Sequence, residues 1–280
     1  MFNDYSIASA FSKNGSGGNK AGIVHGGFKW DTHRKISIAA ELNFSETVFY
    51  YDSQKGNFKL EYFTPKGEIP LCGHATIAFF VYMLESDRIG AGHFMIETKA
   101  GMFGINVEKD GTIFMQQAKP EFLSNVPWDM LKNCFRPLIP DKTISPRIVS
   151  TELSDILMPV ATIEALTSMK ANASAISSVS KQTGCVGIHA FALRSETDKE
   201  KCTAVCRNFA PLYGIEEESA TGTSNCALAC YLHSLGIRPE KYIFEQGRNL
   251  SCESLIEVRL ETNEDEILSV KVGGKGYVLK

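Results

Sequence analysis

The chain has 280 residues and a formal net charge of −3, with 44% hydrophobic and 22% charged residues. This balance indicates a folded globular protein with room for two domains, and it gives no electrostatic reason to expect a nucleic-acid or anionic-membrane partner. The longest apolar stretch, residues 75–84, is shorter than the ~20 residues of a membrane span. The eight cysteines show no disulfide-framework spacing, and the first residues no secretory pattern, so we expect a cytoplasmic protein with reduced thiols.

A glutamate near residue 46 is the first candidate for chemistry. The pattern predicts a helix that ends near Asn43 and a strand that begins at Ser45, where Glu46 would share a face with Val48 and Tyr50. A carboxylate at the start of an apolar strand is partly desolvated, which raises its pKa towards the range of a general acid or base. The alternative is an exposed glutamate at a strand end.

Two segments share one pattern, which indicates an internal duplication. Residues 62–82 run from Tyr-Phe-Thr-Pro through an acidic loop and a glycine to a mostly apolar stretch, and residues 208–231 repeat this order from Asn-Phe-Ala-Pro. The proline ends a strand in each copy, and a helix that is apolar nearly all round lies inside a fold. A further strand candidate follows each copy, at residues 93–97 and 241–245. The sequence therefore predicts two pseudo-symmetric domains, each with strands around a central helix.

Alternating stretches bounded by glycine and charged residues predict the remaining elements. The strands are predicted at residues 58–63, 104–107, 112–115, 186–193, 203–208 and 255–260, and further helices at 162–169 and 173–181. A last strand, residues 270–279, is expected to return to the first domain. We place the N-terminal domain at residues 1–117 plus 268–280 and the C-terminal domain at residues 118–267.

Each central helix begins with a glycine, at Gly73 and Gly222. Helix N-termini present unpaired N–H groups and a positive dipole end, so two such starts are suited to clamp a small carboxylic acid. His74 would be held neutral by the dipole there. The alternative is ordinary helix capping by Thr221 or Ser224.

Cysteine and glycine patterns give no cofactor site. Cys226, Cys230 and His233 share a helix face, but cysteine in a buried helix usually packs as a small hydrophobe. No strand-linked dinucleotide motif and no phosphate-loop motif occurs. We therefore predict neither a metal nor a cofactor.

These motifs together resemble the PhzF-like family, which is named for an isomerase of phenazine biosynthesis. They occur in the family's order over nearly the whole chain. The matching pieces are residues 18–24 (GNKAGIV), 43–47 (NFSET), 63–65 (FTP), 68–76 (EIPLCGHAT), 209–211 (FAP), 214–215 (GI), 220–225 (ATGTSN) and 245–247 (EQG).

The resemblance implies an α+β, diaminopimelate-epimerase-like fold with two pseudo-equivalent domains, each a barrel-like sheet wrapped around a central helix. It also implies an active site in the cleft between them, a homodimer, and a cofactor-independent isomerase that moves a proton between carbons of a small carboxylic acid. Glu46 would be the general acid and base, with His74 and Glu218 as further catalytic residues in the same cleft. The substrate-binding residues it implies are Asn19, Ser45, Gly73, Ala75, Gly222, Thr223 and Ser224.

The chain departs from the family pattern near the second helix start. Glu218 stands where the family has an aspartate and Ser219 where it has a proline, and the family's arginine is missing from residues 251–254. Two other functions remain open. A racemase or epimerase of this fold uses two opposed cysteines, and Cys72 occupies the first position while Ser219 occupies the second. The other alternative is a non-catalytic protein that binds a small acid.

Overall fold

The computed structural model divides into two compact units. The described residues are 4–27, 29–194 and 202–279. The first unit comprises residues 1–116 and 273–280, and the second comprises residues 117–272. Residues 117 and 268–272 thus belong to the second unit, whereas the sequence assigned them to the first. The reason is that β19 (Glu266–Gly274) continues unbroken through the second boundary, so no turn marks it in the sequence.

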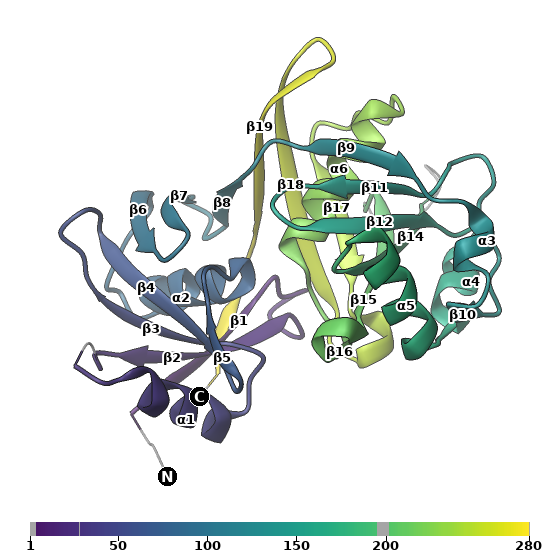
Figure 1. Ribbon diagram of the computed structural model, residues 1–280. Coiled ribbons are helices and arrows are strands. Elements are labelled where there is room, and N and C mark those ends of the chain that lie inside the picture. Colours follow the sequence, from purple (N-terminus) through teal and green to yellow (C-terminus); the bar gives the residue numbers. More distant parts are fainter. Residues whose placement is uncertain (1–3, 28, 195–201, 280) are drawn as a thin grey trace. The chain divides into compact units, whose positions relative to one another are not determined.

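The first unit is a set of strands with one helix inside and one outside (Figure 1). β1 pairs antiparallel with both β2 and β20, and β3 with β4, whereas the β2–β3 and β4–β6 pairs are parallel. The elements are β1 (Ser6–Ala10), β2 (Asn19–His25), α1 (Thr32–Leu42), β3 (Thr47–Asp52), β4 (Phe58–Thr64), β5 (Gly67–Ile69), α2 (Gly73–Glu85), β6 (Gly92–Thr98), β7 (Gly101–Val107), β8 (Ile113–Gln117) and β20 (Tyr277–Leu279).

Helix α2 is the central helix of this unit. Nine of its thirteen residues are buried, as the apolar run predicted. Its Phe79 and Phe80 contact Tyr50 of β3, Phe58 of β4 and Phe94 of β6 through ring contacts of 4.9–6.0 Å. Because strands surround it, the helix start is held inside the unit.

Helix α1 covers the other face of β2, β3 and β4. Ile38 and Ala39 of this helix pack with Val24, Phe49 and Phe63, one residue from each of those three strands. Successive side chains of a strand point to opposite faces of the sheet, so one set packs against α2 and the other against α1.

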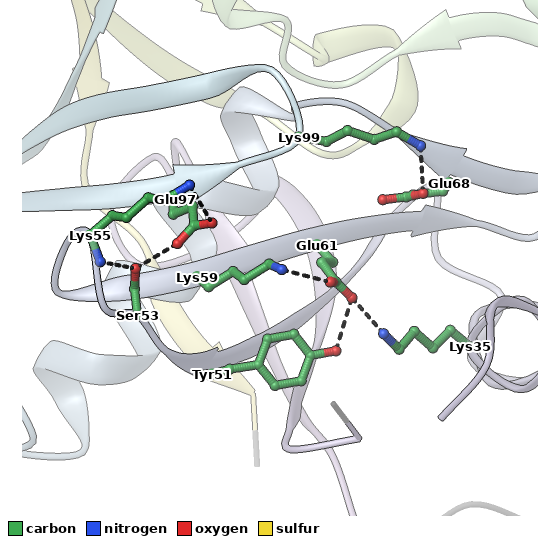
Figure 2. Close-up of polar contacts among 9 residues, drawn as sticks. All are labelled: Lys35, Tyr51, Ser53, Lys55, Lys59, Glu61, Glu68, Glu97 and Lys99. Carbon is green, nitrogen blue, oxygen red and sulfur yellow. Dashed lines mark hydrogen bonds and ion pairs between the residues drawn. The ribbon is translucent and has the colours of Figure 1, made fainter. Parts of the chain in front are cut away.

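A partly buried ion pair fixes α1 to the sheet (Figure 2). Lys35 of α1 donates to the Glu61 carboxylate of β4 at 2.5 Å, and the Tyr51 hydroxyl donates to the same carboxylate at 3.0 Å. The Lys35 ammonium also lies 5.3 Å from the centre of the Tyr51 ring. The Lys35 side chain is only 8% exposed, so its ammonium group has lost most of its water. The contact with the Glu61 carboxylate offsets that loss.

The second unit has the same plan. β11 pairs antiparallel with β9 and with β12, and α6 is buried at eleven of its thirteen residues. The elements are β9 (Glu121–Asn125), α3 (Trp128–Leu131), β10 (Phe135–Arg136), β11 (Arg147–Ser150), β12 (Ser154–Pro159), α4 (Ile163–Ser168), β13 (Lys170–Ala171), α5 (Ala173–Thr183), β14 (Gly187–Leu193), β15 (Ala204–Ala210), η1 (Pro211–Tyr213), β16 (Ile215–Glu218), α6 (Gly222–Ser234), β17 (Tyr242–Gln246), η2 (Arg248–Leu250), β18 (Ser254–Asn263) and β19.

The predicted duplication is confirmed by the strand pairing. β4 pairs antiparallel with β5 and parallel with β6, and β15 pairs antiparallel with β16 and parallel with β17. The repeat extends beyond the two sequence motifs, because the parallel β2–β3 pair around α1 has a counterpart in the parallel β12–β14 pair around α4 and α5. The predicted C-terminal strand is interrupted, and its last part, β20, pairs with β1.

Replacing Glu61 by alanine is expected to lower the free energy of unfolding by about 3 kcal/mol, because it leaves the Lys35 ammonium buried without its partner. Thermal or urea unfolding monitored by circular dichroism measures the change. The matched control is Glu68→Ala, which removes the partner of the 58%-exposed Lys99 (Figure 2) and should cost less than about 1 kcal/mol. Equal losses in the two variants would contradict the assignment.

Candidate active site

Glu46 lies in the short connection between α1 and β3. The connection begins at Asn43, which has a left-handed φ of 54° and donates its backbone N–H to the Ala39 carbonyl, thereby ending α1. β3 starts at Thr47, so the expectation that Ser45 and Glu46 belong to the strand is wrong. The Glu46 carbonyl accepts from the Gly22 N–H at 3.2 Å, which fixes this turn to β2.

The Glu46 carboxylate faces His74, the second residue of α2. Glu46 Oε2 lies 3.1 Å from His74 Nε2, and the two side chains are 13% and 6% exposed. Ser45 Oγ is 3.5 Å from the same nitrogen, and Cys72 Sγ is 3.4 Å from His74 Nδ1. The structure therefore brings together three of the predicted residues, Ser45, Glu46 and His74, and adds Cys72 to them.

The charges of this cluster differ from the sequence expectation. Burial alone would raise the pKa of Glu46, but the facing His74 charge reverses the effect and holds that pKa below its usual value. Burial likewise disfavours a charged imidazole, yet Cys72 and Glu46 together hold the pKa of His74 well above its usual value. Burial raises the pKa of the Cys72 thiol. The cluster is thus a carboxylate–imidazolium pair beside the sulfur of Cys72, and the predictions of a raised Glu46 pKa and a neutral His74 are both wrong.

The first turn of α2 is not capped by a side chain. Its N-cap residue Cys72 makes no side-chain capping bond, whereas Asp31 caps α1, Thr162 caps α4 and Asn172 caps α5. Gly73 and Ala75, two of the predicted binding residues, belong to this turn. No capping side chain therefore accepts from the backbone N–H groups of this turn, and a bound anion could accept hydrogen bonds from them.

The start of α6 is also without a side-chain cap, so the alternative of ordinary capping by Thr221 or Ser224 is wrong. The Thr221 hydroxyl instead donates to the Glu218 carboxylate at 2.7 Å. Gln246 accepts from the Thr221 N–H and donates to the Glu218 carbonyl. Gln246 was not among the predicted site residues, although it lies in one of the matching motifs, residues 245–247.

Ser224 is buried in a polar network of the second unit. Its hydroxyl donates to Asp155 of β12 at 2.6 Å and accepts from Asn208 of β15 at 3.0 Å. Asn208 in turn lies 3.2 Å from His189 of β14. Burial raises the pKa of Asp155 to about 6 and lowers that of His189 to about 4. The Ser224 side chain is therefore held within the protein, so its predicted role in substrate binding would fall to its backbone N–H.

The remaining predicted residues lie at the ends of elements. Asn19 is buried as the first residue of β2, opposite Ala10 of β1. Gly222 is buried at the start of α6, and the neighbouring Thr223 carbonyl accepts from the Thr151 hydroxyl at 3.0 Å. Glu218, Gly222, Thr223 and Ser224 all belong to the second unit.

Only one group of described residues has the donor atoms and spacing of a metal site. It consists of Glu46, Cys72 and His74, whose ligand atoms lie within 4.8 Å of one another. Cys226 and Cys230 are fully buried inside α6, and burial raises the pKa of both thiols, which confirms the packing interpretation of that helix. In the part of the chain that the structure describes, no helix is long and apolar enough to cross a membrane.

The two central helices within their strands define a diaminopimelate-epimerase-like fold. A PhzF-family protein of Bacillus anthracis superposes with a TM-score of 0.88 and 26% identity, covering 99% of this chain and 96% of that one. A putative PhzC/PhzF protein from Clostridium difficile gives 0.75 and 26% over the same shares. A probable proline racemase from Agrobacterium radiobacter, at 12% identity and a TM-score of 0.63 over 99% and 92%, shares the fold alone.

The family follows from the sequence comparison. The family model described as phenazine biosynthesis-like protein, PhzC-PhzF, matches residues 8–280. An uncharacterized isomerase of Clostridium acetobutylicum is 31% identical over 99% of this chain and 96% of its own length, and the uncharacterized isomerase YddE of Escherichia coli K12 is 27% identical over 96% and 94%. The chain belongs to the phenazine biosynthesis-like PhzC-PhzF family, and it is an isomerase of that family.

The pKa of His74 should fall in Glu46→Gln, because the amide keeps the shape but removes one of the charges that stabilise the imidazolium. The raised pKa of His74 also contributes to the free energy of unfolding. This contribution is complete below the pKa of about 6.5 that a histidine has in the unfolded chain, and it is lost as the pH rises through the higher pKa of the folded protein. The contribution of Glu46 is present above the pKa of a carboxyl group in the unfolded chain. It is lost as the pH falls through the lower pKa that Glu46 has in the folded protein.

NMR titration of ring-labelled histidine measures this change. Glu68→Gln serves as the matched control, since Glu68 pairs with Lys99 and should leave the His74 titration where it is. An unchanged His74 titration in Glu46→Gln would show that the carboxylate does not stabilise the imidazolium.

Proposed function

We propose that the protein moves a proton between two carbons of a small carboxylic acid, with Glu46 as the single acid/base residue. The observation that carries the proposal is the buried Glu46–His74 pair at the start of α2. The facing imidazolium keeps the carboxylate ionised and able to accept a proton, and the same charge lowers its basicity, so the transfer depends on the position of the substrate carbon beside it.

In the proposed reaction Glu46 takes a proton from one carbon of the substrate, and the electron pair of that C–H bond moves into the substrate's conjugated system. The protonated Glu46 then returns the proton to a second carbon, on the same face. His74 remains paired with the carboxylate, and its positive charge favours the ionised form that starts the cycle.

The substrate class is inferred from the two uncapped helix starts. Each unit offers one, at Gly73 and at Gly222, and neither first turn contains an acidic side chain. Backbone N–H groups at such starts bind carboxylates without arginine or lysine. At the second start, Thr221 and Gln246 hold Glu218, the residue that replaces the family's aspartate.

The two-cysteine racemase is the less complete alternative. Cys72 immediately precedes α2, and by the register of the duplicated helices its counterpart is Thr221, which immediately precedes α6. Ser219, the counterpart expected from the sequence, lies two residues before it. Neither residue is a thiol, and a hydroxyl is too weak an acid to replace one unaided.

Acetate should bind weakly at the first turns of α2 and α6, because each has unpaired N–H groups and a positive dipole end worth roughly 0.3–1 kcal/mol. Amide NMR during an acetate titration should show shifts at residues 73–75 and 222–224. The starts of α1 and α5 are the internal controls, since Asp31 and Asn172 already cap them. Equal shifts at the capped and uncapped starts would count against specific binding.

Glu46→Gln should abolish carbon-bound hydrogen exchange, by at least about 10²-fold, because the amide cannot carry the proton. Cys72→Ser should retain substantial exchange. The assay incubates the protein in deuterated water with a panel of small unsaturated and cyclic carboxylic acids and follows the exchange by NMR.

Glu68→Gln is the matched control for the amide substitution and should keep the native exchange rate. If Glu46→Gln exchanges normally while Cys72→Ser does not, the two-base racemase mechanism replaces this one. If the native protein binds acids of the panel without exchanging hydrogen in any of them, the small-acid-binding protein is the better description.

A further inference from the structure

We propose that Glu46, Cys72 and His74 form a binding site for a divalent cation of borderline softness, for which Zn²⁺ is the chemical match. The three side chains supply one carboxylate oxygen, one sulfur and one imidazole nitrogen from two points of the chain. This donor set is distinct from the proton-moving role of Glu46, and the sequence patterns predict no metal site.

One of the donor separations matches a tetrahedral ion, and the sulfur must move to complete the site. Zn²⁺ binds oxygen and nitrogen at about 2.0 Å and sulfur at about 2.3 Å, so tetrahedral ligands lie about 3.3 Å (N···O) and about 3.6 Å (S···N) apart. His74 Nε2 lies 3.1 Å from Glu46 Oε2 and 4.0 Å from Cys72 Sγ. The nitrogen–oxygen separation matches, but Sγ lies closer to Nδ1, at 3.4 Å, so one shared ion on Nε2 requires the Cys72 side chain to change rotamer and bring its sulfur to that nitrogen.

The chemistry selects the metal. A thiolate and an imidazole favour Zn²⁺ and Co²⁺, whereas Mg²⁺ and Ca²⁺ require oxygen ligands. One dication with the Glu46 carboxylate, a Cys72 thiolate and neutral His74 has no net charge, which suits a buried position. Three protein ligands leave a fourth position for water or a substrate oxygen.

Binding of the ion would inhibit the enzyme. The metal takes the carboxylate oxygen and the imidazole nitrogen that otherwise face each other, so Glu46 has no free oxygen on that side and His74 loses its ring proton. This consequence rests on the proposed function, whereas the binding itself rests on the donor set alone.

Cobalt substitution tests the site without any substrate. Titration of the reduced full-length protein with Co²⁺ should give the absorption of a tetrahedral ion and a sulfur-to-cobalt charge-transfer band that saturates at one ion per chain. Zn²⁺ should abolish both, and excess Mg²⁺ should change neither.

Cys72→Ser should lose the sulfur band and bind Co²⁺ at least about tenfold more weakly. The matched control is Cys252→Ser, which removes another partly exposed free cysteine and should titrate like the native protein. Glu46→Gln should keep the sulfur band with at least about tenfold weaker binding, which tests the site even if the Cys72 variant does not fold.

The native protein and the two cysteine variants each offer a result that would overturn the proposal. One is a native protein that shows no sulfur-to-cobalt band, and the other is a band that persists in Cys72→Ser or disappears in Cys252→Ser. The test is independent of catalysis, because a cobalt site in a protein whose Glu46→Gln variant exchanges hydrogen normally would refute the proposed function and leave the metal site standing.

Discussion

The ion pair between Glu46 and His74 depends on three segments of chain that meet at one point. The left-handed Asn43 ends α1 and turns the chain, and the Gly22–Glu46 backbone bond holds the turn to β2. Helix α2, enclosed by its strands, presents His74 from its first turn. The Lys35–Glu61 pair fixes the helix that leads to this turn. The charge state of the site therefore depends on packing and hydrogen bonds well outside it.

The duplicated architecture carries different chemistry in its two halves. The start of α2 holds the ionised pair and a thiol, while the start of α6 holds hydroxyl, amide and carboxylate groups that bond to one another. In the register of the two helices, Thr223 occupies the place of His74. A symmetric two-base mechanism needs an acid/base group at the same place in both halves. The asymmetry of the side chains instead favours the proposed single proton-moving residue.

Much of the fold could be predicted from sequence because the relevant signals are local. The Phe-x-Pro strand ends and the apolar runs predicted β4, β15, α2 and α6. The charge state of His74 could not be predicted, since a helix dipole is worth roughly 1 kcal/mol or less, while a carboxylate about 3 Å away in a buried site outweighs it. The buried hydrogen bond of the Ser224 hydroxyl could not be predicted, because its partner Asp155 lies 69 residues away, on another strand. Long-range partners decide such details, and no local pattern contains them.

The central claim is that one carboxylate removes and returns the proton, and the stereochemistry of that transfer tests it most directly. Once a turned-over acid is identified, the isomerisation is run in deuterated water, where the proton held by Glu46 exchanges with solvent in a fraction of the turnovers, and the face of the carbon–deuterium bond in the labelled product is determined by NMR. A single residue predicts that the deuterium arrives on the same face from which the substrate proton left. Delivery to the opposite face would require a second acid across the substrate and would contradict the account.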